Sequence, residues 1–274
     1  MKPPKNFIEY MRRRLLEDKE VLKHGTWRKY DGFVERFAAW RPELPFSQVD
    51  ARLLRLYEGN ERKAGNTDNT LNKKMGYLLR QAFAAAGDKL IDPEKLKGYN
   101  APGETETTPT YLTKVEVEAL EKFRKKTKND TLRKITDWFL LACYSGLRYS
   151  DVHAFRPDMI KGNTASLQMV KTGHWVEVPL HPRLEAVLRR MEPGVYSNQK
   201  FNDYLKVIAD AVGIEKNLTT HVGRHTYAVT FLNADGTKIE TLQELLGQKS
   251  MRSTKVYARI TSDRKAEEIA RVWK

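Results

Sequence analysis

The first hundred residues carry apolar side chains at helical spacing. Four stretches, at about 5–20, 26–41, 47–59 and 67–87, place apolar residues three or four positions apart, as on one face of a helix. No strand pattern separates them, and the repeated positions include the large side chains Trp27, Tyr30, Phe33, Val34, Phe37 and Trp40. We therefore predict a small all-helical domain whose aromatic residues form its core rather than a platform for stacked bases.

A segment poor in apolar residues interrupts this pattern at residues 101–110. It is rich in Pro, Gly and Thr, a composition typical of a linker. A chain of 274 residues is also long for a single hydrophobic core, so two domains are expected. We predict a helical domain at 1–100 and a second domain at 111–274.

The pattern after the linker is helical except in one place. Thr113 and Glu116 have the spacing of a capping box and mark a helix start. Residues 165–170 and 175–180 are short extended runs on either side of a Thr-Gly turn, which predicts a β-hairpin that holds Lys171 beside its turn. Apolar spacing predicts helices at about 113–127, 131–145, 182–191, 198–212, 221–234, 239–246, 250–256 and 262–272. The expected fold class is mainly α with a small β-hairpin or sheet.

Positive charge is spread over the whole chain. The net charge is +14, from 49 Lys and Arg against 35 Asp and Glu. Residues 1–100 hold 21 basic and 14 acidic side chains and residues 101–274 hold 28 and 21, so each part carries +7. Binding of a polyanion by both parts of the chain would explain why each part is basic. Each phosphate that a basic side chain neutralises releases counterions, which favours binding. Solubility explains a basic surface as well, so charge by itself leaves nucleic-acid binding open.

Composition excludes several classes of protein. No run approaches the roughly 20 apolar residues of a membrane-spanning helix, and no apolar segment follows the basic start of the chain as in a secretory signal, so we expect a cytoplasmic protein without a membrane partner. Cys143 is the only cysteine and lies in an apolar run, which predicts a core thiol and excludes an intramolecular disulfide. Without a Cys/His cluster at zinc spacing or paired carboxylates typical of a magnesium site, we expect chemistry that uses no metal and no cofactor.

Five polar residues after the linker suit one chemistry, attack on a phosphodiester. During transfer the phosphorus is crowded and its non-bridging oxygens gain negative charge, which calls for fixed cationic donors, a nucleophile and an acid. Arg148, Arg224 and His221 are the candidate donors. Tyr257 is the candidate nucleophile and Lys171 the candidate acid. Because a tyrosine of ordinary pKa, about 10, is a weak nucleophile at neutral pH, a cationic cluster and a base are required.

The order and spacing of these residues resembles the tyrosine recombinase (phage integrase) family. The resemblance is carried by the segments SGLRYSD at 145–151, KTG at 171–173, HVGRHT at 221–226, ELLGQ at 244–248 and VYAR at 256–259. It covers residues 111–262 and implies a tyrosine-recombinase catalytic domain there. The helical domain before the linker is similar to the family's core-binding (SAM-like) domain in size and character, without a diagnostic motif.

The resemblance implies a role for each of the five residues. Arg148 and Arg224 would bind the scissile phosphate, and His221 would hydrogen-bond it and help to accept the tyrosine proton. Tyr257 would attack phosphorus and leave a 3′-phosphotyrosyl bond and a free 5′-hydroxyl. Lys171 would protonate the departing 5′-oxygen. Attack by the hydroxyl of another strand would then reseal the DNA without ATP or metal.

Three further residues complete the candidate site. Asp151 lies three residues after Arg148, where the family commonly has an acidic residue, and we interpret it as bracing the arginine or histidine cluster. His225 is interpreted as a residue that packs or hydrogen-bonds locally. Gln248 departs from the family, which usually has His and sometimes Trp at this position. Gln can donate a hydrogen bond to a phosphate oxygen but cannot hold a proton, so we expect a reduced rate.

The resemblance further implies a site-specific recombinase whose partner is double-stranded DNA. We expect it to clamp the duplex, to be nucleoid-associated when bound, and to work as a homo-tetramer in which the closing helix, Arg264 to Trp273, packs on a neighbouring protomer. The recombination would integrate or excise a mobile element or resolve chromosome dimers. Two alternatives stay open: a type IB topoisomerase, and a DNA-binding protein whose catalysis has weakened, for which Gln248 is the only sign.

Overall fold

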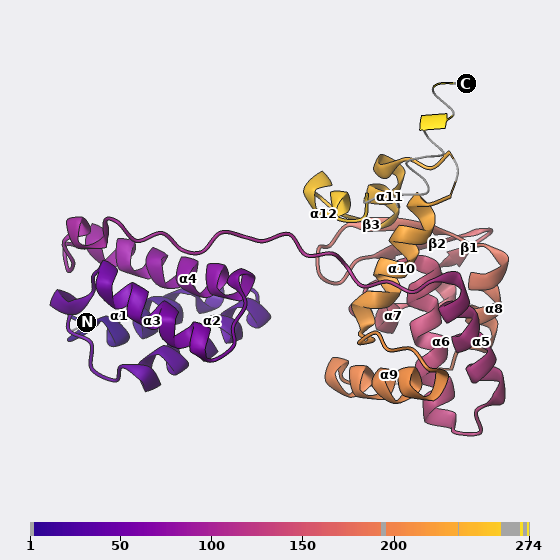
Figure 1. The fold of residues 1–274 in the computed structure, drawn as a ribbon, viewed down its shortest axis with the longest axis horizontal. Helices are drawn as coiled ribbons and strands as arrows, with labels where there is room; N and C mark the ends of the chain where they lie inside the picture. The colour runs from indigo at the N-terminus through magenta and orange to yellow at the C-terminus, as the bar shows by residue number, and fades with distance from the viewer. Residues whose placement is uncertain (1–2, 193–195, 235, 259–268, 271–272, 274) are drawn as a thin grey trace. The chain divides into compact units, whose positions relative to one another are not determined.

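The computed structural model describes residues 3–192, 196–234, 236–258, 269–270 and 273. The chain forms two compact units, Met1–Glu106 and Thr107–Lys274 (Figure 1). The division falls inside segment 101–110, whose residues form no helix or strand. Among the residues described, no helix is both long enough and apolar enough to cross a membrane.

The first unit is helical throughout its described part. It contains α1 (Phe7–Glu17), η1 (Asp18–Glu20), α2 (His24–Trp40), η2 (Phe46–Gln48), α3 (Ala51–Lys63), α4 (Asp68–Gly87) and η3 (Pro93–Leu96), where η marks a 3₁₀ turn. The side chains of Asn6 and Asp50 accept backbone N–H groups in the first turns of α1 and α3, which fixes where these helices begin. Phe33, Phe37 and Tyr57 are buried where the helices meet. The four predicted helices are confirmed, and so is the core position of Phe33 and Phe37, whereas Trp27, Tyr30 and Trp40 are only partly buried against that core.

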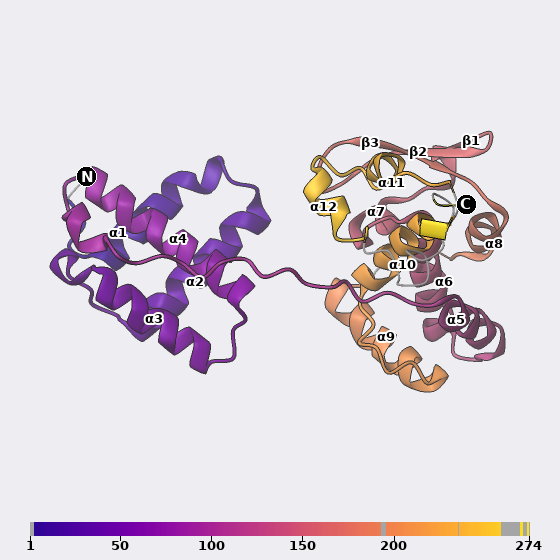
Figure 2. The ribbon, with the colours of Figure 1, turned by 45° about the horizontal axis from the view of Figure 1, so that its top comes forward.

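The second unit surrounds one buried helix, α6 (Asp130–Ser145). Every residue from Ile135 to Ser145 is buried, including the free thiol of Cys143. Four helices pack against α6 (Figure 2): α5 (Lys114–Lys126), α8 (Pro182–Arg190), α9 (Asn198–Val212) and α10 (Thr220–Leu232). Shorter helices follow or connect these: α7 (Tyr149–Ala154), η4 (Pro157–Met159), α11 (Ile239–Leu245) and α12 (Met251–Lys255). The mainly helical fold class is confirmed.

The sheet of the second unit is small and antiparallel. Its strands are β1 (Ile160–Lys161), β2 (Thr164–Gln168) and β3 (Trp175–Pro179), in the order β1-β2-β3. Gln168 pairs with Trp175 at the closed end of the β2–β3 hairpin, so Lys171 lies in the connecting turn as predicted. β3 packs against α11, and the sheet lies on the opposite side of the unit from α9 in both views (Figures 1 and 2).

Some elements differ from the prediction. Helix α7 and strand β1 were not predicted, because six and two residues are too short for a periodic pattern to emerge. β2 ends at Gln168 rather than 170, and α12 is five residues long rather than seven. Most of the closing helix expected at 262–272 lies outside the described residues.

Gly146 ends α6 in a conformation that brings the candidate residues together. Its φ of +70° lies in the left-handed region, and its carbonyl oxygen accepts a hydrogen bond from Arg224 Nη1 at 2.7 Å. A Cβ atom here would lie 2.6 Å from Cδ1 of Tyr227 and 2.9 Å from Cδ2 of Leu246. The position two residues before Arg148 therefore requires glycine for both its backbone angle and its close packing.

We expect Gly146→Ala to lower the free energy of unfolding of the second unit by roughly 3 kcal/mol, the sum of backbone strain and steric overlap. Gly213→Ala is the matched control, because Gly213 also caps a helix, at a φ of +74°, but has open space where its Cβ would be. That variant should lose about 1 kcal/mol. Urea unfolding of the full chain measures both, and equal losses would show that the contact with Tyr227 contributes nothing.

Candidate active site

Arg224 is a buried cation that joins the ends of two helices. It lies on α10 with 3% of its surface exposed. Nη1 donates to the carbonyl oxygen of Gly146 at 2.7 Å, and Nη2 donates to that of Leu246 at 2.8 Å. A guanidinium has five N–H donors, so each Nη keeps a second hydrogen for another acceptor. Burial, and then the charge of Arg148, lower the pKa of Arg224 to about 10, which leaves it charged at neutral pH.

Arg148 and Asp151 form the second part of the site, at the start of α7. Nη1 of Arg148 lies 3.9 Å from Oδ2 of the fully buried Asp151. Asp151 Oδ1 accepts the backbone N–H of Val170 at 2.9 Å, next to Lys171. Asp151 thus connects the Arg148 segment to the hairpin turn. Arg148 Nη1 is itself buried and lacks a hydrogen-bond acceptor among the described residues, a costly state that an anionic oxygen would relieve.

His221 lies within the field of three cations. It is the second residue of α10, and its pKa is lowered by burial and then by the charges of Arg224, Lys171 and Arg148. The imidazole is therefore neutral at physiological pH. Lys171 is exposed in its turn, which is closed by a hydrogen bond from the N–H of Gly173 to the carbonyl of Met169 at 2.8 Å.

Tyr257 follows α12 and points its hydroxyl into this cluster. The side chain is buried, and Nδ1 of His225 lies 3.0 Å from its Oη. Burial raises the pKa of Tyr257 above its ordinary value of 10.0, while Arg224, Arg148 and Gln248 act in the opposite direction. The hydroxyl is therefore held in its neutral form.

His225 has a closer relation to the candidate nucleophile than its sequence position suggested. A local hydrogen bond was expected, but the observed partner of His225 is Tyr257, 32 residues further along the chain. Burial, His221 and Arg224 lower the pKa of His225 to about 4, so the ring is neutral. The sequence offered one signal for this role, the position of His225 directly after Arg224. That signal does not predict a shared site, because adjacent residues on a helix usually point in different directions.

Gln248 lies in the same cluster, held by a residue that sequence reasoning missed. Its Oε1 accepts a hydrogen bond from Thr254 Oγ1 at 2.6 Å, and its amide forms a hydrogen bond to Tyr257 that favours the ionised phenol. Thr254 is fully buried. No motif singles out a threonine at this position.

The arrangement suits an anion and a nucleophile. The charges of Arg224 and Arg148 act on the neutral Tyr257 hydroxyl, and the neutral imidazole of His225 lies beside it. This is the equipment that phosphoryl transfer needs, namely donors for the growing charge and a group that accepts a proton. Within the described ranges, no three or more His, Cys, Asp or Glu side chains gather in a way that would hold a metal ion.

Comparisons with known proteins agree on one family. Residues 110–264 match the model of the phage integrase family. Tyrosine recombinase XerD of Lacticaseibacillus casei is 26% identical over 216 residues, 71% of each chain. Tyrosine recombinase XerA of Thermococcus kodakarensis is 27% identical over 296 residues, 99% of this chain and 98% of the relative.

Solved structures show the same fold. The Tn1549 transposon integrase in complex with transposon right end DNA has a TM-score of 0.77 at 16% identity, covering 98% of this chain and 100% of that one. A lambda integrase dimer bound to a COC′ core site has a TM-score of 0.75 at 17% identity, covering 90% and 93%.

The burial of His225 predicts a dependence of stability on pH. Its ordinary pKa is 6.5, so in the unfolded chain it gains a proton as the pH falls below about 6.5, whereas the folded ring stays neutral until about 4. Between pH 6.5 and about pH 4 the unfolded state therefore binds more protons than the folded state. The free energy of unfolding of the second unit should fall as the pH falls through this range. We expect His225→Asn to show a shallower loss in urea unfolding at a series of pH values. A His225 ring that titrates near 6.5 by NMR in the folded chain would contradict this.

Proposed function

The chain belongs to the phage integrase family, the tyrosine site-specific DNA recombinases, and we propose that Tyr257 is the nucleophile with which it cuts and rejoins DNA. One observation carries this assignment. The Tyr257 hydroxyl lies in a pocket of positive charge, with Arg224 and Arg148 as its cationic neighbours and the neutral His225 at 3.0 Å. In such a setting the phenol is placed to attack a phosphate that the arginines bind.

The two arginines bind the scissile phosphate in this proposal. Arg224 is fixed by two carbonyl oxygens and retains N–H donors on both Nη atoms. Arg148 offers a buried Nη1 whose hydrogen-bond capacity is unused among the described residues. Gln248 adds a neutral donor from its amide. A phosphodiester oxygen between these groups accepts their hydrogen bonds. These bonds become stronger as negative charge develops on the oxygen in the transition state.

In the cleavage step one bond forms and one bond breaks. Tyr257 Oη bonds to phosphorus, the bond from phosphorus to the 5′-oxygen breaks, and Lys171 gives that oxygen a proton. The tyrosine proton passes to the pair of neutral imidazoles, of which His225 lies 3.0 Å from Oη and His221 lies 6.2 Å from His225 between ring centroids. Resealing is the reverse, in which a 5′-hydroxyl attacks and Tyr257 leaves with its proton restored.

We propose double-stranded DNA as the partner of both units. In the first unit, Lys29 and Arg36 on α2 and Lys73 on α4 are exposed around a groove of about 210 Å³. Its floor is the stacked pair Tyr30 and Tyr77, with ring centroids 4.1 Å apart. Three exposed cations around one groove concentrate positive charge where a phosphate backbone could bind.

The test of this function is covalent capture on DNA. We expect the full chain, mixed in EDTA with supercoiled plasmids that carry a library of genomic fragments from its source, to form a protein–DNA adduct on particular fragments. Mass mapping should place the bond on Tyr257, and Tyr257→Phe should form no adduct. Tyr204→Phe, which removes a hydroxyl from α9, is the matched control and should retain the adduct.

The products separate the alternatives. Recombinant junctions between two captured sites identify a recombinase, and their joined sequences distinguish integration or excision of a mobile element from dimer resolution. Relaxation of every plasmid without a preferred site would identify a type IB topoisomerase. Salt-sensitive binding without any adduct would mean a DNA-binding protein and would overturn the assignment of Tyr257.

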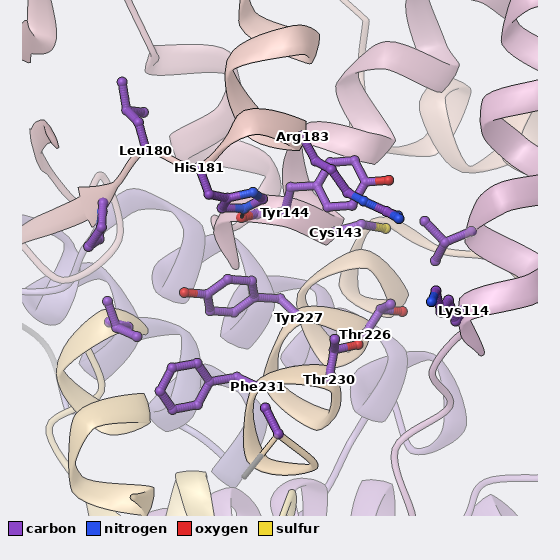
Figure 3. A pocket seen from close by; sticks show the side chains of 14 residues that line it. Lys114, Cys143, Tyr144, Leu180, His181, Arg183, Thr226, Tyr227, Thr230 and Phe231 are labelled. Atoms are coloured by element: carbon purple, nitrogen blue, oxygen red, sulfur yellow. Dashed lines mark hydrogen bonds between the residues drawn. The ribbon is translucent and has the colours of Figure 1, made fainter. Parts of the chain in front are cut away.

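A pocket on the second unit supports assembly between copies of the chain. It has a volume of about 530 Å³ and lies between α5, α6, α10 and the residues that lead into α8 (Figure 3). Tyr144, Tyr227 and Phe231 present ring faces and edges to it. Ile269 and Trp273, near the end of the chain, are 61% and 79% exposed. We propose that the C-terminal segment of a neighbouring copy fills this pocket in a tetramer on two DNA sites.

Removing the apolar end of the chain should therefore block assembly while sparing DNA binding. We expect the double variant Ile269→Ala, Trp273→Ala to lose at least about tenfold in formation of the two-site complex, seen by analytical ultracentrifugation with captured DNA. Val115→Ala is the matched control, since Val115 is 74% exposed in the same unit but does not line the pocket. Unchanged assembly in the double variant, or in a chain truncated after Thr261, would refute the docking.

A further inference from the structure

Thr254 connects two members of the site through two different groups. Its backbone carbonyl accepts the N–H of Tyr257 at 3.0 Å. Its side-chain hydroxyl donates to Oε1 of Gln248 at 2.6 Å. The residue itself is fully buried. A single residue thus sets the position of the candidate nucleophile and of the amide beside it.

We propose that Thr254 is a positioning residue for DNA cleavage, which holds the Gln248 amide with its N–H₂ end facing Tyr257 and the bound phosphate. This inference rests on the proposed role of Tyr257 as nucleophile. It adds a residue that neither the family resemblance nor the sequence pattern marks.

The need for such a residue follows from the chemistry of an amide. One end of the Gln248 side chain donates hydrogen bonds and the other end accepts them. If the carbonyl end faced Tyr257, it would repel both the developing phenolate and the phosphate oxygens. A histidine at this position donates from whichever ring nitrogen is protonated, whereas a glutamine that is rotated by half a turn presents the wrong group.

The surroundings of Gln248 leave this rotation to Thr254. The backbone of Gln248 is fixed on both sides by Gln243, whose carbonyl accepts the Gln248 N–H at 3.1 Å and whose Nε2 donates to the Gln248 carbonyl at 2.9 Å. The side-chain oxygen has Thr254 as its hydrogen-bond donor. With Oε1 engaged there, the N–H₂ end of the amide is left to donate to Tyr257, whose pKa the Gln248 side chain lowers.

The arrangement also explains how a neutral residue serves where relatives in the family usually have His. An amide does not titrate, so its donor strength is constant over the pH range in which a histidine ring, with an ordinary pKa of about 6.5, changes charge. We therefore expect the cleavage rate of Gln248→His to rise relative to the parent as the pH falls below about 6.5. A merely structural role of position 248 would give parallel pH profiles.

The experiment compares Thr254→Val with Thr254→Ser on the DNA fragment that the parent chain captures. Valine keeps the shape and removes the hydroxyl, so we expect a loss of about tenfold in the single-turnover rate of adduct formation, the effect of one hydrogen bond. Serine keeps the hydroxyl and should restore most of the rate. Thr136→Val is the matched control, because Thr136 is also fully buried and donates to the carbonyl of Leu132, away from the site.

A double-mutant cycle separates positioning from general damage. In a Gln248→Ala background, Thr254→Val should cause no further loss of rate, because the amide that Thr254 orients is gone. Additive losses, or an unchanged rate in Thr254→Val, would overturn the proposal. Thermal unfolding of each variant identifies any chain that fails to fold.

A second measurement needs no DNA. The side-chain amide of Gln248, assigned in ¹H–¹⁵N NMR spectra by its absence from Gln248→Ala, should exchange with water faster in Thr254→Val than in the parent. If the parent forms no adduct, the function of Tyr257 fails, yet this exchange rate still decides whether Thr254 holds the amide. Equal exchange in both chains would refute the positioning role on its own.

Discussion

The buried guanidinium of Arg224 holds the site together. It is 3% exposed, and its two hydrogen bonds go to the carbonyl oxygens of Gly146 and Leu246. A buried charge is tolerated only where it is well hydrogen-bonded, so the ends of α6 and α11 must remain where they are for Arg224 to remain where it is. Both helix ends are followed or formed by glycine, at Gly146 and Gly247, which allows their carbonyls to turn towards the same cation.

The same cation sets the protonation of its neighbours. Together with burial, it keeps His221 and His225 neutral, while burial keeps the Tyr257 hydroxyl protonated against the pull of the arginines. The site therefore concentrates its positive charge on the arginines and Lys171, while Tyr257 and the two imidazoles stay uncharged. That division suits a reaction in which negative charge grows on phosphate oxygens and a proton crosses from one oxygen to another.

Periodicity and spacing predicted much of this structure, and the reason for each failure is physical. The long helices and the hairpin that carries Lys171 follow from apolar patterns that extend over several turns or strand pairs. Helix α7 was not predicted because six residues show no period, and no side-chain hydrogen bond caps its start. The bond from His225 to Tyr257 joins residues 32 positions apart, and only tertiary folding brings them into contact.

The residues near Gln248 show a further limit of sequence reasoning. The sequence showed that Gln248 departs from the family pattern. It did not show that Thr254 orients the Gln248 amide, because Thr254 acts through a hydroxyl that any surface threonine also has. The burial of Thr254 distinguishes it, and burial is a property of the folded chain. Patterns that depend on side-chain identity alone therefore identify chemistry more readily than they identify the neighbours that orient it.

The hydrogen bond between His225 and the buried Tyr257 has a consequence for the protein between rounds of reaction. A phenol that is enclosed and keeps its proton is a poor target for alkylating or nitrating reagents, which react most readily with exposed, ionised phenols. In the proposed reaction the proton leaves only when a backbone phosphate occupies the arginine pair, so the reactivity of Tyr257 would be a property of the complex with DNA and not of the free protein.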